Sequence, residues 1–377
     1  MGESDQGLWR HCRVNRVHIV SGCNEKGPAC VLVETDGLRL LLDLGYGPDP
    51  DRRPDLAGIG PVDALLLSHG HRDHTGSLAL ARGIGDPQVW CTAPVAVMLP
   101  PETRTVILPT AGQCEVAGLR VQTGRNGHAP GGVWLHLRTG HGDLLYTGDC
   151  SIESPVHAFD PPPAARVAVV DASYGDYDMP LTEAAQALAD LLAGRAGTVP
   201  DAVLPVPPGG RGPEIAWYLA TRQGWPVQLG DDLRHAIERL CDEAAHGLRP
   251  GMRESLRGLA RSAPGLSDEP GIRLAGSADG STGESAALLE RFADQPQVTI
   301  VFTGYLPHGS PARALTEAGR ARYLRWNVHP RRRDIVALAR SCGVRHLLPA
   351  FGEHASMARM RAELDPVEMI TTREHSW

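Results

Sequence analysis

Histidine and aspartate side chains gather in one short segment, residues 69–74, which reads HGHRDH. In an extended backbone His69 and His71 point to the same side, so two imidazoles can meet one metal ion. Where the chain turns, Asp73 and His74 can face a second ion. Imidazole and carboxylate ligands without thiolate suit Zn²⁺, Mn²⁺ or Fe, and ions about 3.5–4 Å apart can activate water for hydrolysis.

Short elements must hold this segment in place. The apolar run Ala64–Leu67 is typical of a fully buried strand and residues 76–81 are expected to be helical, so the cluster should lie on a strand-to-helix loop. Two later residues could add ligands: His128 precedes the predicted strand Val133–Leu137, and Asp149 ends another strand-like run. Either side chain alone is more often a turn residue, but their order after the first cluster favours metal binding.

The segments HGHRDHTG at 69–76, Gly-His at 127–128 and Thr-Gly-Asp at 147–149 resemble the metallo-β-lactamase superfamily. That resemblance implies an αββα sandwich with a dinuclear metal site at one edge. It also implies a role for each ligand: His69, His71 and His128 for the first metal, Asp73 and His74 for the second, and Asp149 as the bridge.

The stretch after Asp149 departs from a plain member of this fold, because it alternates between helix and strand patterns. Asp171 lies in VDASYGD, which resembles the signature at which β-CASP nucleases begin an inserted domain. Three further segments, at 210–214, 277–283 and 302–313, resemble later β-CASP segments in the right order. The predicted fold is therefore α/β, with a metallo-β-lactamase sandwich (1–176 and 315–377) and an inserted α/β β-CASP-like domain (177–314).

Glycine-rich turns and arginines in this region could bind substrate phosphate through backbone N–H groups and guanidinium groups. The candidates are Arg211, Gly304, Tyr305 and Arg313. Residues 305–345 also hold nine arginines against two acidic residues, a basic segment in a chain of formal net charge -7. Each arginine could equally be a solvated surface charge.

The β-CASP resemblance implies two late histidines, and the sequence matches only one of them. His329, in Val-His-Pro, resembles the family's general acid, which would protonate the leaving oxygen. The second histidine should precede Gly-Glu after the last strand, but Phe351 occupies that position and cannot bind a metal. His354 or Glu353 could substitute, the second metal could be weakly held, or the substrate could differ from RNA.

These assignments predict a metal-dependent hydrolase with a metal-activated water, most simply a β-CASP-type phosphodiesterase or ribonuclease. Its catalytic candidates are Asp73, Asp171 and His329, and its expected cofactors are two divalent ions, with Zn ahead of Mn or Fe. Single-stranded RNA or another phosphodiester is the expected substrate, and a homodimer is left open. The alternatives are hydrolysis of a small phosphodiester or ester metabolite, and a non-catalytic subunit that binds nucleic acid or protein.

Composition argues against several other classes. The 377 residues are 42% hydrophobic and 21% charged, close to globular averages, which disfavours disorder. No apolar run approaches the roughly 18 residues needed to span a membrane. No secretory signal is visible, and the eight cysteines form no C-x-x-C pair, so we expect buried thiols and a cytoplasmic location.

Overall fold

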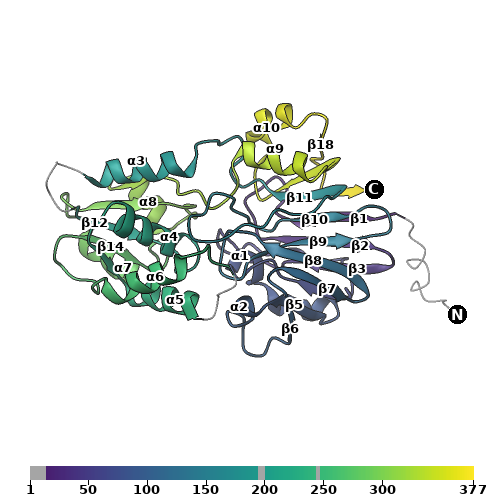
Figure 1. The fold of residues 1–377 in the computed structure, drawn as a ribbon, viewed down its shortest axis with the longest axis horizontal. Helices are drawn as coiled ribbons and strands as arrows, with labels where there is room; N and C mark the ends of the chain where they lie inside the picture. The colour runs from purple at the N-terminus through teal and green to yellow at the C-terminus, as the bar shows by residue number, and fades with distance from the viewer. Residues whose placement is uncertain (1–13, 194–199, 243–246) are drawn as a thin grey trace.

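The computed structural model describes residues 14–193, 200–242 and 247–377, which form three sheets and their flanking helices. Two seven-stranded sheets pack as a sandwich at one end of the molecule, and a five-stranded sheet with its helices forms the other end (Figure 1). The short helix α1 (Arg72–Thr75) lies between the two ends, so the histidine-rich segment sits where they meet (Figure 1).

The first sheet of the sandwich has the order β19-β1-β2-β3-β4-β5-β6. Its strands are β1 (Arg16–Ser21), β2 (Cys30–Thr35), β3 (Leu38–Leu42), β4 (Ala64–Leu66), β5 (Gln88–Thr92), β6 (Thr105–Leu108) and β19 (Glu374–Ser376). Strands β1 to β3 are antiparallel neighbours, whereas β3 to β6 run parallel. Residues of β4 are fully enclosed, as the unbroken apolar run at Ala64–Leu67 predicts.

The second sheet has the order β18-β17-β11-β10-β9-β8-β7. Its strands are β7 (Gly112–Val116), β8 (Leu119–Arg125), β9 (Val133–Arg138), β10 (Leu144–Tyr146), β11 (Val167–Asp171), β17 (His346–Ala350) and β18 (Glu368–Met369). Strand β17 pairs in parallel with β11, with Ala350 opposite Asp171. The last part of the chain therefore completes a sheet that the first part began.

Apolar side chains fill the space between these sheets and under the helices outside them. Val33, Leu42, Leu135 and Val169 lie in the shared core of the sandwich. Helices α9 (Arg332–Ser341) and α10 (Ala358–Glu363) cover the outer face of the second sheet (Figure 1). The segments η3 (Leu78–Ile84) and α2 (Ala93–Ala96) cover the first. This is the αββα arrangement that the sequence predicts.

The third sheet is entirely parallel, in the order β13-β14-β12-β15-β16. Its strands are β12 (Ala202–Pro205), β13 (Val227–Leu229), β14 (Ile272–Ala275), β15 (Thr299–Phe302) and β16 (Ala321–Tyr323). Helices α3 (Leu181–Ala193), α4 (Arg211–Trp217), η4 (Tyr218–Arg222), α5 (Asp231–Asp242), α6 (Met252–Ser262), α7 (Gly283–Phe292) and α8 (Pro311–Glu317) accompany it. Strand β16 lies beyond residue 314, where the sequence places the end of the inserted domain; the predicted boundaries stay predictions.

Local structure around the histidine-rich segment differs from the expected single helix at 76–81. The chain forms α1 within the cluster itself and then the 3₁₀ segment η3, which ends at Gly85 with φ 92°. Helix α1 begins because His74 N–H and Thr75 N–H both donate to the His71 carbonyl. His74, which lies within this turn, is buried and packs against His69.

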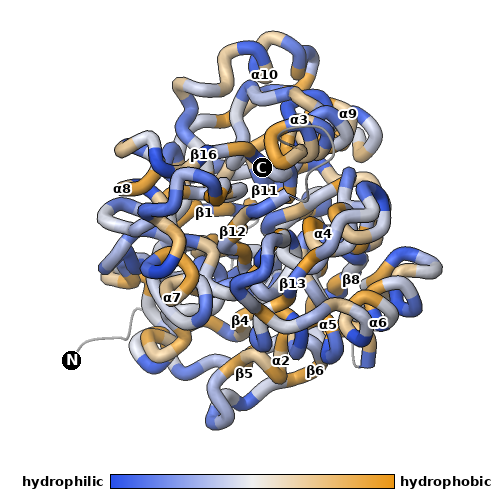
Figure 2. The backbone as a smooth tube through the Cα atoms, turned by 90° about the vertical axis from the view of Figure 1, so that its left-hand side faces the viewer, coloured by the Kyte–Doolittle hydropathy of each residue, from blue (hydrophilic) through white to orange (hydrophobic). Residues whose placement is uncertain are grey.

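Hydropathy changes over short distances along the backbone, so apolar stretches alternate with polar ones (Figure 2). None of the helices within 14–193, 200–242 and 247–377 has the length and apolar character needed to cross a membrane.

Candidate metal centre

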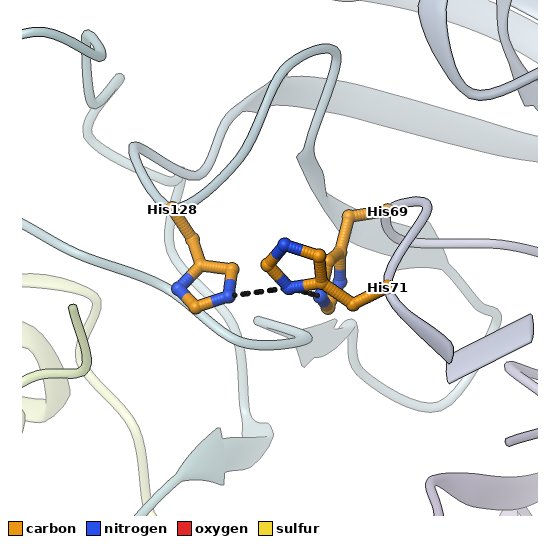
Figure 3. Close-up of side chains that lie close together, drawn as sticks. All are labelled: His69, His71 and His128. Atoms are coloured by element: carbon orange, nitrogen blue, oxygen red, sulfur yellow. Dashed lines mark hydrogen bonds between the residues drawn. The ribbon is translucent and has the colours of Figure 1, made fainter. Parts of the chain in front are cut away.

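Three imidazoles bring one ring nitrogen each to a common point (Figure 3). His71 Nδ1 lies 3.1 Å from His69 Nε2 and 3.0 Å from His128 Nε2. His69 and His71 follow β4, whereas His128 comes from the loop between β8 and β9. His71 is extended, with φ -69° and ψ 150°, which keeps its ring on the same side as that of His69.

Hydrogen bonds behind these rings decide which nitrogen faces inward. His128 Nδ1 donates to the Val328 carbonyl at 2.6 Å, so its Nε2 carries the lone pair. His69 Nδ1 lies 3.1 Å from Ser68 Oγ, which leaves Nε2 directed at the same point. A proton on His71 Nδ1 could form a hydrogen bond to only one of the two neighbouring nitrogens, His69 Nε2 or His128 Nε2. Three convergent nitrogens therefore fit a divalent cation better than a hydrogen-bond network.

The electrostatics of the three rings agree with this. Burial lowers the pKa of His69, His71 and His128, because a charged imidazole is poorly solvated there. The neighbouring imidazoles lower the pKa of His69 further. All three rings are therefore neutral near pH 7, which is the form that binds metals.

A second group of potential ligands consists of His69, His74 and Asp149. His74 Nε2 lies 3.2 Å from Asp149 Oδ1, and this buried oxygen accepts no hydrogen bond. Burial opposes the charged form of both groups, but their mutual attraction holds the pKa of His74 well above and that of Asp149 well below the ordinary range. Asp149 also belongs to a third group of potential ligands, with His128 and His329. It is therefore shared by two groups, as a bridging carboxylate would be.

Asp43 supports this second group, and sequence reasoning assigned it no role. It is fully buried just after β3 and accepts hydrogen bonds from Ser68 N (2.7 Å), Ser68 Oγ (2.7 Å) and Tyr146 Oη (2.6 Å). Its Oδ2 also lies 2.8 Å from His74 Nδ1, which turns His74 Nε2 toward Asp149. The available signal was an acidic residue at the end of a strand beside β4.

Asp73, Phe351 and His354 all bear on the second metal position, and each lies in a different place relative to the ligand groups. Asp73 lines the cavity beside His71 but belongs to none of the three ligand groups. The Phe351 ring packs against His74, with ring centroids 5.3 Å apart, at the position expected of a ligand. His354 also belongs to none of the groups. Its backbone N–H donates to Asn24 Oδ1 at the start of a separate 3₁₀ turn, and a ligand role for His354 stays a prediction.

His329 reaches the same site from the segment between β16 and α9. Its Nδ1 lies 2.7 Å from Asp171 Oδ2. Asp171 is fully buried at the end of β11, and its carboxylate also accepts from the backbone N–H groups of Cys150 (3.1 Å) and Ser173 (3.0 Å). Asp171 therefore fixes the orientation of the His329 ring and leaves Nε2 available for proton transfer.

Two adjoining cavities, of about 330 and 280 Å³, open over these ligands. Arg211 and Tyr305 line both of them, and Gly304 lines the second. A Cβ atom at Gly304 would lie 2.2 Å from the Arg211 guanidinium, so only glycine allows this packing. Arg313 lines neither cavity, because its guanidinium donates to the Leu306 carbonyl at 2.7 Å, and its part in phosphate binding stays a prediction.

The arginine-rich segment is also less of a free basic face than its composition suggests. Arg331 pairs with Asp334 at 2.8 Å, and both Arg332 and Arg333 pair with Asp178. Arg325 is different: its guanidinium lies 4.4 Å from the Tyr174 ring centroid and lines the second cavity. Within the described residues, four of the nine arginines of this segment therefore pair with carboxylates: Arg313, Arg331, Arg332 and Arg333.

Comparison with known proteins agrees with the fold and the site. Residues 24–200 match the family model described as the metallo-beta-lactamase superfamily. The chain is 24% identical to transcription termination factor FttA of Methanosarcina mazei, over 80% of the chain and 57% of that protein. It is 23% identical to endoribonuclease YSH1 of Yarrowia lipolytica, over 78% of the chain and 43% of that protein.

Two further similarities are more limited in what they show. Cleavage and polyadenylation specificity factor subunit 2 of Oryza sativa subsp. japonica is 42% identical over 86 residues, which cover 21% of the chain and 12% of that protein. A crystal structure of a protein of unknown function from Enterococcus faecalis V583 covers 97% of the chain and 99% of its own, with a TM-score of 0.60 and 14% identity. This last likeness concerns the fold alone.

The sandwich and the histidine–aspartate cluster at its edge define a protein of the metallo-β-lactamase fold, in which divalent metal binding is expected. Residues 24–200 match a metallo-beta-lactamase superfamily domain, and the relatives FttA and YSH1 are compatible with the β-CASP resemblance of the sequence motifs. The chain spans about half the length of the curated relatives that it matches.

Proposed function

We propose that this chain is a metal-dependent phosphodiesterase, most simply a ribonuclease that cuts single-stranded RNA. The observation that carries the proposal is the convergence of His69, His71, His128 and Asp149 below a cavity that Arg211 also lines. Three neutral imidazoles and one carboxylate that could hold divalent cations, with a guanidinium beside them, suit an anionic phosphodiester. The similarity to proteins named an endoribonuclease and a termination factor supports nucleic acid as the substrate class.

Two divalent ions are part of the proposal, with Zn²⁺ first and Mn²⁺ or Fe as alternatives. His69, His71 and His128 would hold the first, and His74 and Asp149 the second, with Asp149 shared and Asp73 beside it. When bound, such ions supply Lewis acidity and an activated water. Because Phe351 replaces one ligand, the second position would bind its ion more weakly than the first.

The chain's own groups would complete the reaction. Arg211 and Tyr305 would hold the phosphate in the cavity that they line. His329 would donate a proton from Nε2 to the leaving oxygen, while Asp171 keeps its Nδ1 hydrogen-bonded. Gly304 would contribute by allowing the guanidinium to lie flat against the backbone.

Cleavage assays test this proposal directly. We expect labelled single-stranded RNA to be cut when Zn²⁺ or Mn²⁺ is supplied, and His71→Ala to abolish cutting. Arg82→Ala, an exposed residue that lines neither cavity, should leave cutting unchanged. If neither RNA nor DNA of any form is cut with either metal, the nuclease function is refuted.

A second candidate function, hydrolysis of a small phosphodiester or ester, is favoured by one observation. A mostly apolar recess of about 150 Å³ lies beside His71 and is lined by Val97, Met98 and Leu240. Such a recess would accept an apolar part of a small substrate. A panel of dinucleotides and esters separates the two functions, and fewer than one bound metal per chain would favour a non-catalytic binding subunit instead.

Location and assembly belong to the same proposal. The cysteines of the described residues are free thiols, and six of these seven are buried, which suits a reducing cytoplasm. Light scattering of the purified chain measures whether it forms the homodimer that the sequence analysis leaves open.

A further inference from the structure

Lys26 is the only lysine in the 377 residues, and it lies in the cleft of the metal centre. It comes from the loop between β1 and β2 and lines both cavities, together with Arg211 and His329. The ammonium of lysine is a compact point charge with three donor hydrogens, whereas every other cationic side chain of the Lys/Arg type here is a guanidinium. The single ammonium therefore lies at the shared wall of the two cavities.

The hydrogen bonds of Lys26 leave part of its ammonium free. Nζ donates to Ser173 Oγ at 3.1 Å, and Ser173 Oγ donates to Asp171 Oδ1 at 2.6 Å. Within the ranges that the structure describes, Nζ makes no ion pair with a carboxylate. Two of its three hydrogens are thus available to an anion in the cleft, and Ser173 ties its position to the Asp171–His329 pair.

Phe351 and the loop that carries Lys26 are packed directly together. Phe351 N–H donates to the Gly22 carbonyl at 2.7 Å, and a Cβ atom at Gly22 would lie 2.7 Å from the phenyl ring. Phe351 also lines the second cavity with Lys26. The phenyl ring supplies neither a ligand nor a charge, and Lys26 is one of three cations, with Arg211 and Arg325, that line the same cavity.

We propose that Lys26 is a substrate-binding residue that holds a phosphate oxygen of the phosphodiester on the Phe351 side of the centre, opposite the Arg211 guanidinium. This inference rests on the proposed function and deepens it. An ammonium there would replace part of the positive charge that a weakly held second ion fails to supply. Because a charge-assisted hydrogen bond is involved, its loss should weaken phosphate binding by about 10-fold or more.

A lysine-selective label tests this, because the chain has one lysine side chain. Reductive methylation with ¹³C-formaldehyde labels Lys26 and the terminal amine, and the spectrum of Lys26→Arg identifies the latter signal. We expect the Lys26 methyl resonance of the metal-stripped protein to shift on titration with inorganic phosphate and with a phosphorothioate oligonucleotide. A resonance that does not move at saturating oligonucleotide overturns the proposal.

Variants supply a second readout. Lys26→Met should weaken oligonucleotide binding by about 10-fold or more and Lys26→Arg by less, both with unchanged metal content. Arg82→Met, far from the cleft, is the matched control and should bind as the parent chain does. Equal affinity in Lys26→Met and the parent chain would refute the proposal. A phosphate-induced shift without cleavage of any nucleic acid would support the anion site and refute the nuclease function.

Discussion

Replacing Asp43 by asparagine should weaken metal binding without removing any ligand. The carboxylate accepts four hydrogen bonds, one at Oδ1 from Ser68 N and three at Oδ2, including that of His74 Nδ1 at 2.8 Å. An asparagine at this position can turn its side-chain oxygen toward the three donors that Asp43 Oδ2 now accepts from. Its NH₂ group then takes the place of Oδ1 and faces the Ser68 N–H, which is also a donor. That arrangement leaves one buried donor unsatisfied, at a cost of about 1–3 kcal/mol in the free energy of unfolding.

The effect on metal binding is separate from this loss of stability. Without the carboxylate behind it, His74 loses the partner that fixes its ring, so Nε2 is less well presented to an ion. Loss of such a supporting carboxylate usually costs about 10–100-fold in metal affinity. Competition titration of the stripped protein with a chromophoric zinc chelator measures the affinity, and urea unfolding of the same sample measures the stability.

A matched control separates the general effect of removing one carboxylate charge from the specific effect of removing the carboxylate that supports His74. Asp63→Asn changes an exposed aspartate that accepts a backbone hydrogen bond from Arg39, so it should leave zinc affinity unchanged. If Asp43→Asn binds zinc as tightly as the parent chain does, then Asp43 does not support the centre and the assignment of His74 as a ligand loses its main structural argument.

Three other predictions follow from the same geometry. Phe351→His should add a second tightly bound zinc ion per chain by elemental analysis, because the ring at 351 already faces His74; unchanged zinc content would count against a ligand position there. His329→Gln should lower kcat by about 10²–10⁴-fold with metal content intact, and undiminished turnover would exclude His329 as the proton donor. Burial raises the pKa of Glu214 to about 7 from the ordinary 4.5, so the folded chain holds a proton that the unfolded chain releases between these pH values. The free energy of unfolding should therefore fall by up to ~3 kcal/mol from pH 4.5 to 7. Urea titrations at several pH values should show a smaller fall in Glu214→Gln. The same pH dependence of the unfolding free energy in both proteins would contradict this.

The parts of the site that lie close together in the sequence were predictable from it. The ligand types at 69–74 follow a buried strand, and this local pattern was enough to predict that the rings of His69 and His71 lie side by side. The class of fold followed from the alternation of strand and helix patterns and from the resemblance of a few motifs.

The parts that depend on long-range packing were not predictable. His128 is oriented by the carbonyl of Val328, which is 200 residues away in the sequence, and no local pattern encodes such a contact. Arg313 was assigned by its position in a motif, but its guanidinium donates to the Leu306 carbonyl, a contact that the motif does not encode.

We propose that a divalent metal at the histidine–aspartate cluster drives cleavage of a phosphodiester. The most direct measurement is the zinc and manganese content per chain, combined with cleavage of labelled single-stranded RNA by the same preparation before and after chelation. We expect at least one bound metal per chain. Chelation should abolish the cutting of RNA and added metal should restore it, and His71→Ala should lose both the metal and the cutting. Cutting that survives complete removal of metal, or a metal-loaded protein that cuts no phosphodiester, would contradict this proposal.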